Sequence, residues 1–287
     1  MTVIRSAILL VLAAATMGAA PPERSCATLR VMSYNIRLDL ASDGVNQWSA
    51  RRDQFIGQIG LMRPAILGLQ EVVPGQKADL EHALPGYEFL GVARDDGLAK
   101  GEFSSLAVDR NVFRVGSSGT FWLSPTPDVP SKGWDAAYPR IATWAKLVRR
   151  SDGRRLLALN THFDHEGQTA RLEAARQIVR WVEAQRAKGE TVIVTGDLNA
   201  EPGTPPLIEL TAGLRDARIV TETPAVGPEG TFNGFTLVPA ENRRIDYVLV
   251  DPIVNVERYA VLAWHGEGGR PASDHFPVVV DLRVCGK

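Results

Sequence analysis

An acidic and an imidazole side chain stand next to each other near the C-terminus of this 287-residue chain, as Asp274-His275. The apolar run 277–280 follows almost at once and has the composition of a buried strand. Two titratable groups at the start of such a run lose solvation unless they have a role at the edge of the strand. We therefore predict that Asp274 and His275 lie at the rim of a functional site.

Polar side chains also occur upstream at points where predicted strands begin or end. Asn35 follows 29–34, Glu71 follows 66–70, Asn160 and His162 follow 156–159, Asp197 and Asn199 follow 191–196, and Asp246 lies at the start of 245–250. A single Asp or Asn after a strand is usually a turn former. A whole set of acids, amides and imidazoles that several strands deliver to one rim indicates instead a site for a metal and a phosphate.

The oxygen atoms of this set favour a hard divalent cation. Carboxylates and amides select Mg²⁺, Mn²⁺ or Ca²⁺ over zinc, and the sequence has neither a cysteine cluster nor a His-x-x-x-His pair. A few carboxylates with open water positions suit Mg²⁺ that is bound together with a substrate phosphate. We therefore predict Mg²⁺ as the cofactor, with Mn²⁺ as the alternative.

Two of the five histidines, His162 and His275, lie in segments that already contain candidate residues. A histidine in catalysis needs a partner that fixes its tautomer, and a carboxylate serves well. Asp246 is the predicted partner of His275, and Glu102 that of His162. A structural role is the alternative for each histidine, and His165 is a secondary candidate.

Two residues around a proline-rich loop, 124–139, are candidates for substrate binding. Arg140 precedes a predicted strand and could clamp a phosphate, although a solvent-facing salt bridge is the alternative. Trp134 could stack on a base or a sugar, although an aromatic residue in such a loop can simply pin it.

Composition limits the possible partners. The chain is 45% hydrophobic and has a formal net charge of −1, so it lacks the global positive field that holds a long nucleic acid. The first 20 residues have a basic residue, Arg5, a short apolar run, 7–15, and small residues at 18–20. This pattern predicts a cleaved signal peptide and export to the periplasm or the medium; a membrane anchor is the alternative, but the run is short for a span.

The element pattern alternates strands and helices over one domain, 21–287. Helices are expected at 49–62, with Ser49 as N-cap, at 77–84 and at 169–187, and strands at 29–36, 66–70, 87–92, 103–108, 119–123, 141–148, 155–160, 191–195, 245–250, 256–262 and 276–284. Candidate residues end the early strands but begin the late ones. If all face one site, the two groups of strands run in opposite directions, so the sheets must be mixed or antiparallel.

The only two cysteines, Cys26 and Cys285, stand at opposite ends of the predicted mature domain. The first and last strands are expected to be antiparallel, which would place both cysteines at the end far from the site. If these strands are neighbours, we predict a disulfide, which export would permit; two unrelated thiols are the alternative. The bridge would contribute about 4–5 kcal/mol in the chain-entropy model, and less if strained.

Six motifs, taken in order, resemble those of the endonuclease/exonuclease/phosphatase (deoxyribonuclease-I-like) superfamily. They are Ser33-Tyr34-Asn35-Ile36-Arg37, Leu69-Gln70-Glu71-Val72, Asn160-Thr161-His162, Gly196-Asp197-Leu198-Asn199, Ile245-Asp246-Tyr247 and Ser273-Asp274-His275. The resemblance spans about 29–284, and the segment 121–144 is similar to an exported bacterial branch of uncharacterised members. It implies a four-layer α/β sandwich in which two facing sheets carry helices outside.

The resemblance also implies roles for individual residues. Glu71, Asn35 and Asp274 would bind the metal, Asp197 and Asn199 would position the attacking water and the phosphoryl group, and His275 with Asp246 would form a catalytic dyad. His162, Arg140, Asn160 and Glu102 would lie on the phosphate side of the site. Either Asp197 or His275 could be the formal base, and one or two metal ions remain possible.

The predicted activity is hydrolysis of a phosphodiester, in a nucleic acid or a nucleotide, by in-line attack of water. A phosphomonoesterase, or a phosphodiesterase for lipid or sugar phosphates, is the alternative within the superfamily. A catalytically inactive binding module is a third class, but a relic should have lost part of the polar set. We expect a monomer without a stable membrane span.

Overall fold

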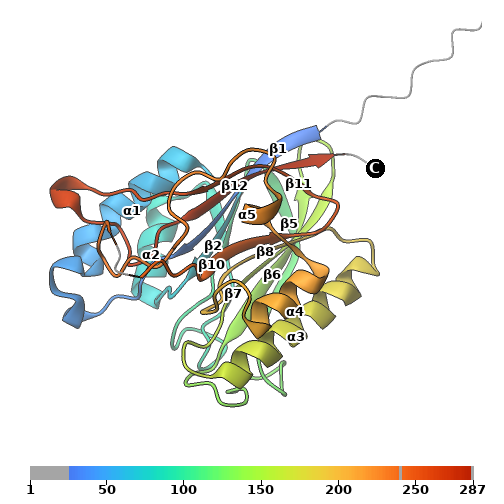
Figure 1. The fold of residues 1–287 in the computed structure, drawn as a ribbon, viewed down its shortest axis with the longest axis horizontal. Helices are drawn as coiled ribbons and strands as arrows, with labels where there is room; N and C mark the ends of the chain where they lie inside the picture. Colours follow the sequence, from blue (N-terminus) through green and yellow to red (C-terminus); the bar gives the residue numbers. More distant parts are fainter. Residues whose placement is uncertain (1–25, 239–240, 286–287) are drawn as a thin grey trace, which may run out of the picture.

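The computed structural model describes residues 26–238 and 241–285, and these form two facing β-sheets with helices outside (Figure 1). The predicted signal peptide, 1–20, lies outside the described residues. The first sheet has the order β11-β12-β1-β2-β4-β3 and the second the order β5-β6-β7-β8-β10-β9. In the described part of the chain, no helix has both the length and the apolar character that a membrane span requires.

The element bounds are as follows. The first sheet contains β1 (Cys26–Asn35), β2 (Ile66–Gln70), β3 (Tyr87–Leu90), β4 (Leu106–Asp109), β11 (Asn255–Val261) and β12 (Val278–Cys285). The second contains β5 (Phe113–Trp122), β6 (Ile141–Arg149), β7 (Arg155–His162), β8 (Val192–Asp197), β9 (Arg215–Asp216) and β10 (Asp246–Val250). The helices are α1 (Trp48–Met62), α2 (Pro74–Ala83), α3 (Gln168–Arg186), α4 (Pro205–Gly213) and α5 (Ala217–Val220), with 3₁₀ turns η1 (Ala41–Asn46) and η2 (Glu267–Gly269).

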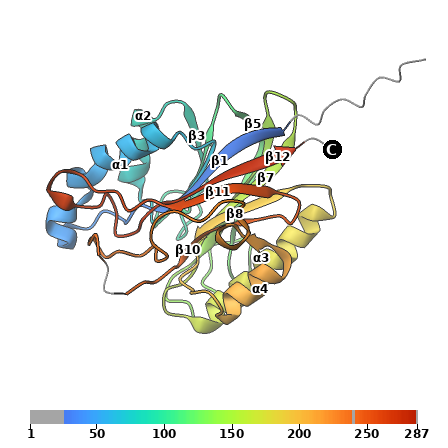
Figure 2. The ribbon, with the colours of Figure 1, turned by 45° about the horizontal axis from the view of Figure 1, so that its top comes forward.

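Three apolar clusters define the four layers. The middle cluster fills the space between the sheets, where residues such as Val31 and Ile66 of the first sheet meet Leu156 and Val248 of the second. The other two bury the outer faces: α1 and α2 cover the first sheet, and α3 and α4 cover the second (Figure 2). The predicted α/β sandwich is therefore confirmed.

Strand directions follow the predicted mixed pattern. In the first sheet β1 runs parallel to β2 and antiparallel to β12, and in the second β7 runs parallel to β8 while β10 is antiparallel to β8. Parallel neighbours end at one edge of a sheet, and an antiparallel neighbour begins there. Each sheet thus brings the ends of two strands and the start of a third to the same edge of the sandwich.

Several local predictions are corrected. Helix α1 begins at Trp48, one residue before the proposed cap Ser49, and has no side-chain cap. Helix α2 starts at Pro74 rather than 77, as proline is well tolerated in the first turn of a helix. Helix α4 was not predicted, because its apolar residues lie within a short segment that opens with two prolines.

Candidate active site

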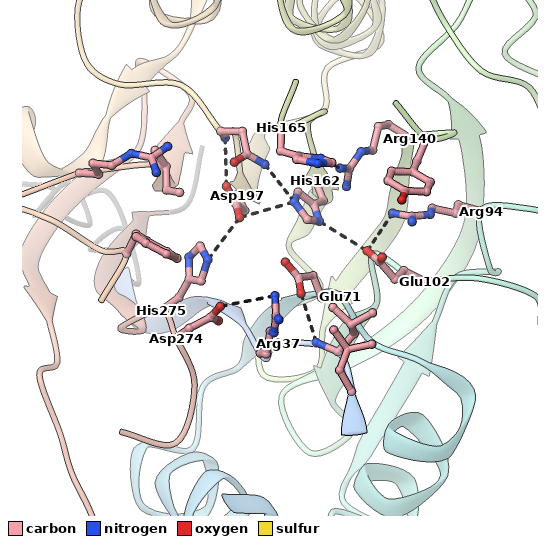
Figure 3. Close-up of a pocket in the computed structure, with 17 residues that line it drawn as sticks. Arg37, Glu71, Arg94, Glu102, Arg140, His162, His165, Asp197, Asp274 and His275 are labelled. Atoms are coloured by element: carbon pink, nitrogen blue, oxygen red, sulfur yellow. Dashed lines mark hydrogen bonds and ion pairs between the residues drawn. The ribbon is translucent and has the colours of Figure 1, made fainter. Parts of the chain in front are cut away.

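Most of the residues predicted to do chemistry line a cavity of about 590 Å³ at this edge of the sandwich (Figure 3). Asn35, Asp246, Asn160 and Trp134 are not among its lining residues. Ligand atoms of Glu71, Asp197 and His275 all lie within 4.8 Å of one another. Glu71 directly follows β2, Asp197 ends β8, and His275 precedes β12, so both sheets contribute to the same cluster. These three side chains therefore lie together, as predicted.

Asn35, the last residue of β1, joins the two carboxylates of this cluster. Its Nδ2 lies 2.9 Å from Oε1 of Glu71 and 3.0 Å from Oδ2 of Asp197, while its Oδ1 accepts a bond from the backbone N–H of Arg37 at 2.9 Å. Ionised carboxylates only accept hydrogen bonds, so the NH₂ group of the Asn35 amide must face Glu71 and Asp197. In this arrangement Asn35 orients the carboxylates and does not present its oxygen to them.

His275 and Asp246 form a buried pair. Nδ1 of His275 lies 2.8 Å from Oδ2 of Asp246, and Nε2 lies 3.8 Å from Oδ2 of Asp197. The ring of Phe232 packs edge-on against the imidazole, with centroids 5.2 Å apart. Burial opposes protonation, but the attraction of Asp246 and Asp197 outweighs it and raises the pKa of His275 well above its usual value.

His162 has the opposite electrostatic environment. Its Nε2 lies 3.1 Å from Nδ2 of Asn199, which donates, so the ring proton is placed on Nδ1, 3.9 Å from Oε2 of Glu102. Burial, followed by the charges of Arg140 and Arg94, lowers the pKa of His162 well below its usual value. The pKa values of the two histidines are therefore shifted in opposite directions.

Acidic groups are in excess at the cluster. Burial, reinforced by Asp246, raises the pKa of Asp197 to about 7. Burial also raises the pKa of Asp274, whose Oδ2 lies 3.8 Å from Nη1 of Arg37. Asp274 lines the cavity but is not one of the three groups whose ligand atoms gather within 4.8 Å. Together with Glu71, these acids make a pocket that a divalent cation would neutralise.

The opposite side of the cavity carries two buried guanidinium groups. Arg140 is 5% exposed; its Nε lies 3.2 Å from Asp164 and its Nη2 lies 2.9 Å from Nδ1 of His165, which leaves Nη1 without a partner among the described residues. Arg94 is 8% exposed, and its Nη1 lies 2.8 Å from Oε2 of Glu102. Buried cationic donors of this kind suit the oxygens of a phosphate.

Two residues that line the cavity are held in strained backbone conformations. Glu71 has φ of 63° and Asn199 has φ of 43°, both in the left-handed region. The backbone N–H of Asn199 donates to Oδ1 of Asp197 at 3.0 Å, and that of Leu38 donates to Oε2 of Glu71 at 3.1 Å. Non-glycine residues adopt this conformation at a cost of about 1–3 kcal/mol, and such strain clusters at functional sites.

Asn160 is a correction to the predicted substrate-binding set. It is fully buried and does not line the cavity. Its Nδ2 donates to the carbonyls of Leu69 and Ser105, and its Oδ1 accepts from Gln70 and Thr195. These four bonds use the full capacity of the amide. Asn160 therefore links the two sheets beneath the site, and no donor remains for a substrate.

Trp134 is the second correction. It is half-buried with φ of 48°, and it does not line the cavity. Its neighbour Asp135 accepts bonds from the backbone N–H groups of Thr169 and Ala170, so the loop is fixed to the start of α3. Tyr138 of the same loop reaches the cavity instead. It is 50% exposed, with the guanidinium of Arg94 4.8 Å from its ring centre.

Sequence reasoning also missed four polar cavity residues, which are Arg37, Arg94, Tyr138 and Arg243, besides the apolar lining. Arg37 belongs to the first motif but has no role assigned to it from the sequence, and Arg94 lies in a turn outside the six motifs. The position of Arg37 at the end of the first motif is a signal from which its place in the site could have been predicted. Arg243 lies in a loop with no comparable local pattern, and its place in the cavity depends on the long-range fold.

The model of the Endonuclease/Exonuclease/phosphatase family matches residues 32–275, and the chain belongs to this family. A solved family member from Bacteroides thetaiotaomicron is 35% identical, with 90% of this chain and 98% of that chain covered and a TM-score of 0.85. The mannosyl-6-phosphatase of the same organism is 37% identical, with coverage of 88% and 99% and a TM-score of 0.84.

More distant proteins share the fold. Danio rerio TDP2, solved with a single-strand DNA product, is 19% identical with a TM-score of 0.70, and the alignment covers 89% of this chain and 98% of that chain. A curated relative, uncharacterised protein L388 of Acanthamoeba polyphaga mimivirus, is 27% identical over 164 residues. That match covers 55% of this chain and 61% of the mimivirus protein.

Proposed function

We propose that this protein is a divalent-metal-dependent hydrolase that acts on a small, soluble phosphate ester. The observation that carries the proposal is the convergence of Glu71, Asp197 and His275 within 4.8 Å at the base of the cavity. Carboxylates at this spacing suit a bound metal, and an imidazole beside buried arginines suits the phosphate that binds with it. Family membership supports the same class of chemistry.

The donor set fits a hard cation. Glu71 offers carboxylate oxygens, and Asp197 and Asp274 add acidic groups to the same cavity. We propose Mg²⁺, with Mn²⁺ as the alternative. When bound, such an ion neutralises phosphate charge and stabilises the leaving oxygen.

The protein's own groups would orient and activate the attacking water. Oδ1 of Asp197 is fixed by the backbone N–H of Asn199 and Oδ2 by the amide of Asn35, so this carboxylate is positioned to accept a proton from the water. His275, protonated beside Asp246, would donate through Nε2 to the phosphoryl oxygens as their charge grows. Arg140 and Arg94 would hold the remaining oxygens.

A phosphate monoester is the first candidate substrate. The near-neutral chain offers little attraction for a polymer of phosphates, whereas two buried arginines and a protonated histidine suit one compact, highly charged group. The 37% identity to a mannosyl-6-phosphatase over almost the whole of that chain supports a monoester of a sugar-like alcohol.

The phosphodiester predicted from the sequence is the second candidate. It is favoured by the continuity of the catalytic cavity with a second cavity, because His165, Asn199, Arg243 and Ile245 line both. This arrangement leaves room for an ester substituent in addition to the alcohol that leaves. Nucleotides and short diesters are the substrates of this type that the charge of the chain permits.

The test is a hydrolysis panel with purified protein and Mg²⁺ or Mn²⁺. It contains p-nitrophenyl phosphate, bis-p-nitrophenyl phosphate, hexose phosphates, nucleotides, single-stranded DNA and phospholipid vesicles. We expect metal-dependent turnover that chelation removes and that His275→Ala lowers strongly. Preference for monoesters supports the first candidate, and preference for diesters supports the second. Absence of turnover on every ester would contradict the proposed function.

A further inference from the structure

A second and larger cavity, of about 830 Å³, adjoins the catalytic one. The two share His165, Asn199, Arg243 and Ile245 along their common border. Beyond that border the second cavity is lined by the first turn of α3, including Gln168 and Arg171, and by the segment 200–206 that leads into α4. A molecule whose phosphate lies in the catalytic cavity can therefore extend into this space.

The second cavity is poorly suited to another anion. Arg171 already donates to the carbonyl of Asp164 at 2.9 Å, and Nε of Arg243 lies 3.8 Å from Oε1 of Glu201. The two helix N-termini also offer few free N–H donors to an anion. Asp135 accepts the N–H groups of Thr169 and Ala170 in the first turn of α3. Helix α4 opens with two prolines, which have no N–H. The positive charges that would attract a second phosphate are thus partly balanced by Asp164 and Asp135 near Arg171 and by Glu201 near Arg243.

The remaining lining mixes polar side chains with apolar ones such as Leu172 and Ile245, and it has no flat aromatic platform. Gln168 brings an amide and Glu201 a carboxylate, while the guanidinium of Arg243 adds donors at the border. Among the described residues that line this cavity, His165 is the only one with an aromatic side chain. Its imidazole already stacks on Tyr138, with centroids 6.0 Å apart. A nucleobase is usually held by aromatic stacking, so this lining favours hydroxyl groups over a base.

We propose that the second cavity binds the organic part of the ester substrate, and that this part is a neutral, hydroxyl-rich group such as a sugar or a polyol. The inference rests on the proposed function, since it places the phosphate in the catalytic cavity. The same group could be the alcohol of a monoester or one of the two alcohols of a diester. Both sources present the same hydroxyl chemistry to Gln168, Glu201 and Arg243.

Gln168→Trp tests this proposal by filling the cavity. Gln168 is exposed at the first position of α3, outside the catalytic cavity, and its side chain has no role in the proposed chemistry. Glu183→Trp is the matched control, because Glu183 is exposed on the same helix and lines neither cavity. Melting temperatures of both variants show whether the fold is retained.

The substrates are a hexose 6-phosphate, its methyl diester and p-nitrophenyl phosphate. We expect Gln168→Trp to lower kcat/KM for whichever hexose ester the wild type prefers by about tenfold or more. The value for p-nitrophenyl phosphate should change by less than about twofold, and Glu183→Trp should change neither. The preferred ester identifies the source of the sugar group.

Four results would overturn the inference. Equal losses on the hexose ester and p-nitrophenyl phosphate would show general damage to the active site, and unchanged kcat/KM on both would show that the second cavity is not used. A wild type that hydrolyses p-nitrophenyl phosphate but no hexose ester would exclude a sugar group while leaving the proposed function intact. A wild type that hydrolyses no ester would remove both proposals.

Discussion

Nδ1 of His275 lies 2.8 Å from Oδ2 of Asp246, and the two side chains are only 5% and 0% exposed. Asp246 is the first residue of β10, directly opposite Asp197 of β8 in the antiparallel register. One strand pairing therefore sets the separation between the carboxylate that orients the histidine and the carboxylate proposed as base. The relative positions of these two charged groups are therefore fixed by the sheet.

Replacement of Asp246 tests this coupling. Asp246→Asn keeps the volume but removes the charge that holds His275 protonated, so we expect kcat to fall by a factor of about 10²–10³. His275→Ala should cause a loss of similar size, and the double variant should be little worse than either single one, because the two residues act as a unit. Steady-state kinetics measure all three. Near-wild-type turnover of Asp246→Asn would show that the pair is only structural.

Glu71 is predicted to dominate metal affinity. Glu71→Gln keeps a similar shape but loses the anionic ligand, so the Kd for Mg²⁺ or Mn²⁺ should rise by about tenfold or more. Isothermal titration calorimetry without substrate measures the affinity independently of activity. The control is Glu102→Gln, in the same cavity but outside the cluster of three ligand atoms, which should leave the Kd nearly unchanged. The role assigned to Glu71 fails if its variant titrates like the wild type.

Asn160 is predicted to matter for stability. Asn160→Leu would remove four buried hydrogen bonds, to the carbonyls of Leu69 and Ser105 and to the side chains of Gln70 and Thr195. The carbonyl of Ser105 and both side chains would each keep one other partner. We expect the free energy of unfolding to fall by about 3 kcal/mol or more, measured by urea denaturation. Asn255→Leu, at the exposed start of β11, should change it by less than about 0.5 kcal/mol. A small effect at Asn160 would mean that the two sheets do not depend on this link.

The sheets approach each other closely at this link. A Cβ atom on Gly68 would lie 2.0 Å from Oγ1 of Thr195 and 2.5 Å from Oδ1 of Asn160. Both clashing atoms belong to the opposite sheet. Position 68 therefore requires glycine because the two sheets lie close together there, and not because the chain turns. Asn160 and Gly68 together explain why the Asn-Thr-His motif begins with an amide that never reaches the substrate.

The cluster of Glu71, Asp197 and His275 could be predicted from the sequence because each residue is recognisable within its own short segment. Glu71, Asp197 and His275 each stand beside an apolar run, and opposite strand directions followed from the positions of such residues. Asn35 and Asn160 show the limit of that signal, since both are amides beside apolar runs. Asn35 ends β1 at the site, whereas Asn160 lies two residues before the end of β7 and bonds to the other sheet. That difference depends on the packing of the two sheets, which no local pattern reveals.

Loop residues were the least predictable part of the site. The choice between Trp134 and Tyr138 depends on Asp135, which fixes the loop to α3 from 34 and 35 residues away. Arg94 has no local signal in the sequence, because its partners, Glu102 and Tyr138, are brought to it by the fold. Such contacts combine two segments, and the composition of either segment alone is ordinary.

The pair of Arg140 and Asp164 predicts how stability depends on pH. Burial opposes ionisation of Asp164, but backbone N–H groups, led by that of Gly167, together with Arg140 outweigh it and lower its pKa. A carboxyl whose pKa is lower in the folded state contributes stability above its unfolded pKa of about 3.9, and this contribution is lost as pH falls toward the folded pKa.

Asp164→Asn should therefore flatten the fall in the free energy of unfolding below about pH 4, and it should lower stability at pH 7 because Arg140 loses its buried partner. Urea denaturation at several pH values measures both effects. A parallel shift of the whole curve, with the same acid slope as the wild type, would show that Asp164 does not contribute to the acid response.

The predicted disulfide depends on one backbone pairing. Strand β1 lies antiparallel to β12, and the register places Cys26 opposite Cys285. Directly opposite residues of an antiparallel pair have Cα atoms about 4.5–5.5 Å apart, within the range that a disulfide spans. Peptide mapping by mass spectrometry, on protein exported into an oxidising compartment and prepared without reductant, should find the two cysteines joined. Two alkylated free thiols would contradict the bridge.

The bridge would close a loop of nearly the whole domain, so it should stabilise the fold chiefly by restricting the unfolded chain. Cys26→Ser should lower the free energy of unfolding by up to about 4–5 kcal/mol, and less if the native bridge is strained. Cys285→Ser and reduction of the wild type should have the same effect, and the double variant should be no less stable than either single one. Since both cysteines lie at the end of the sheets far from Glu71 and His275, kcat/KM at a temperature where every variant is folded should not change.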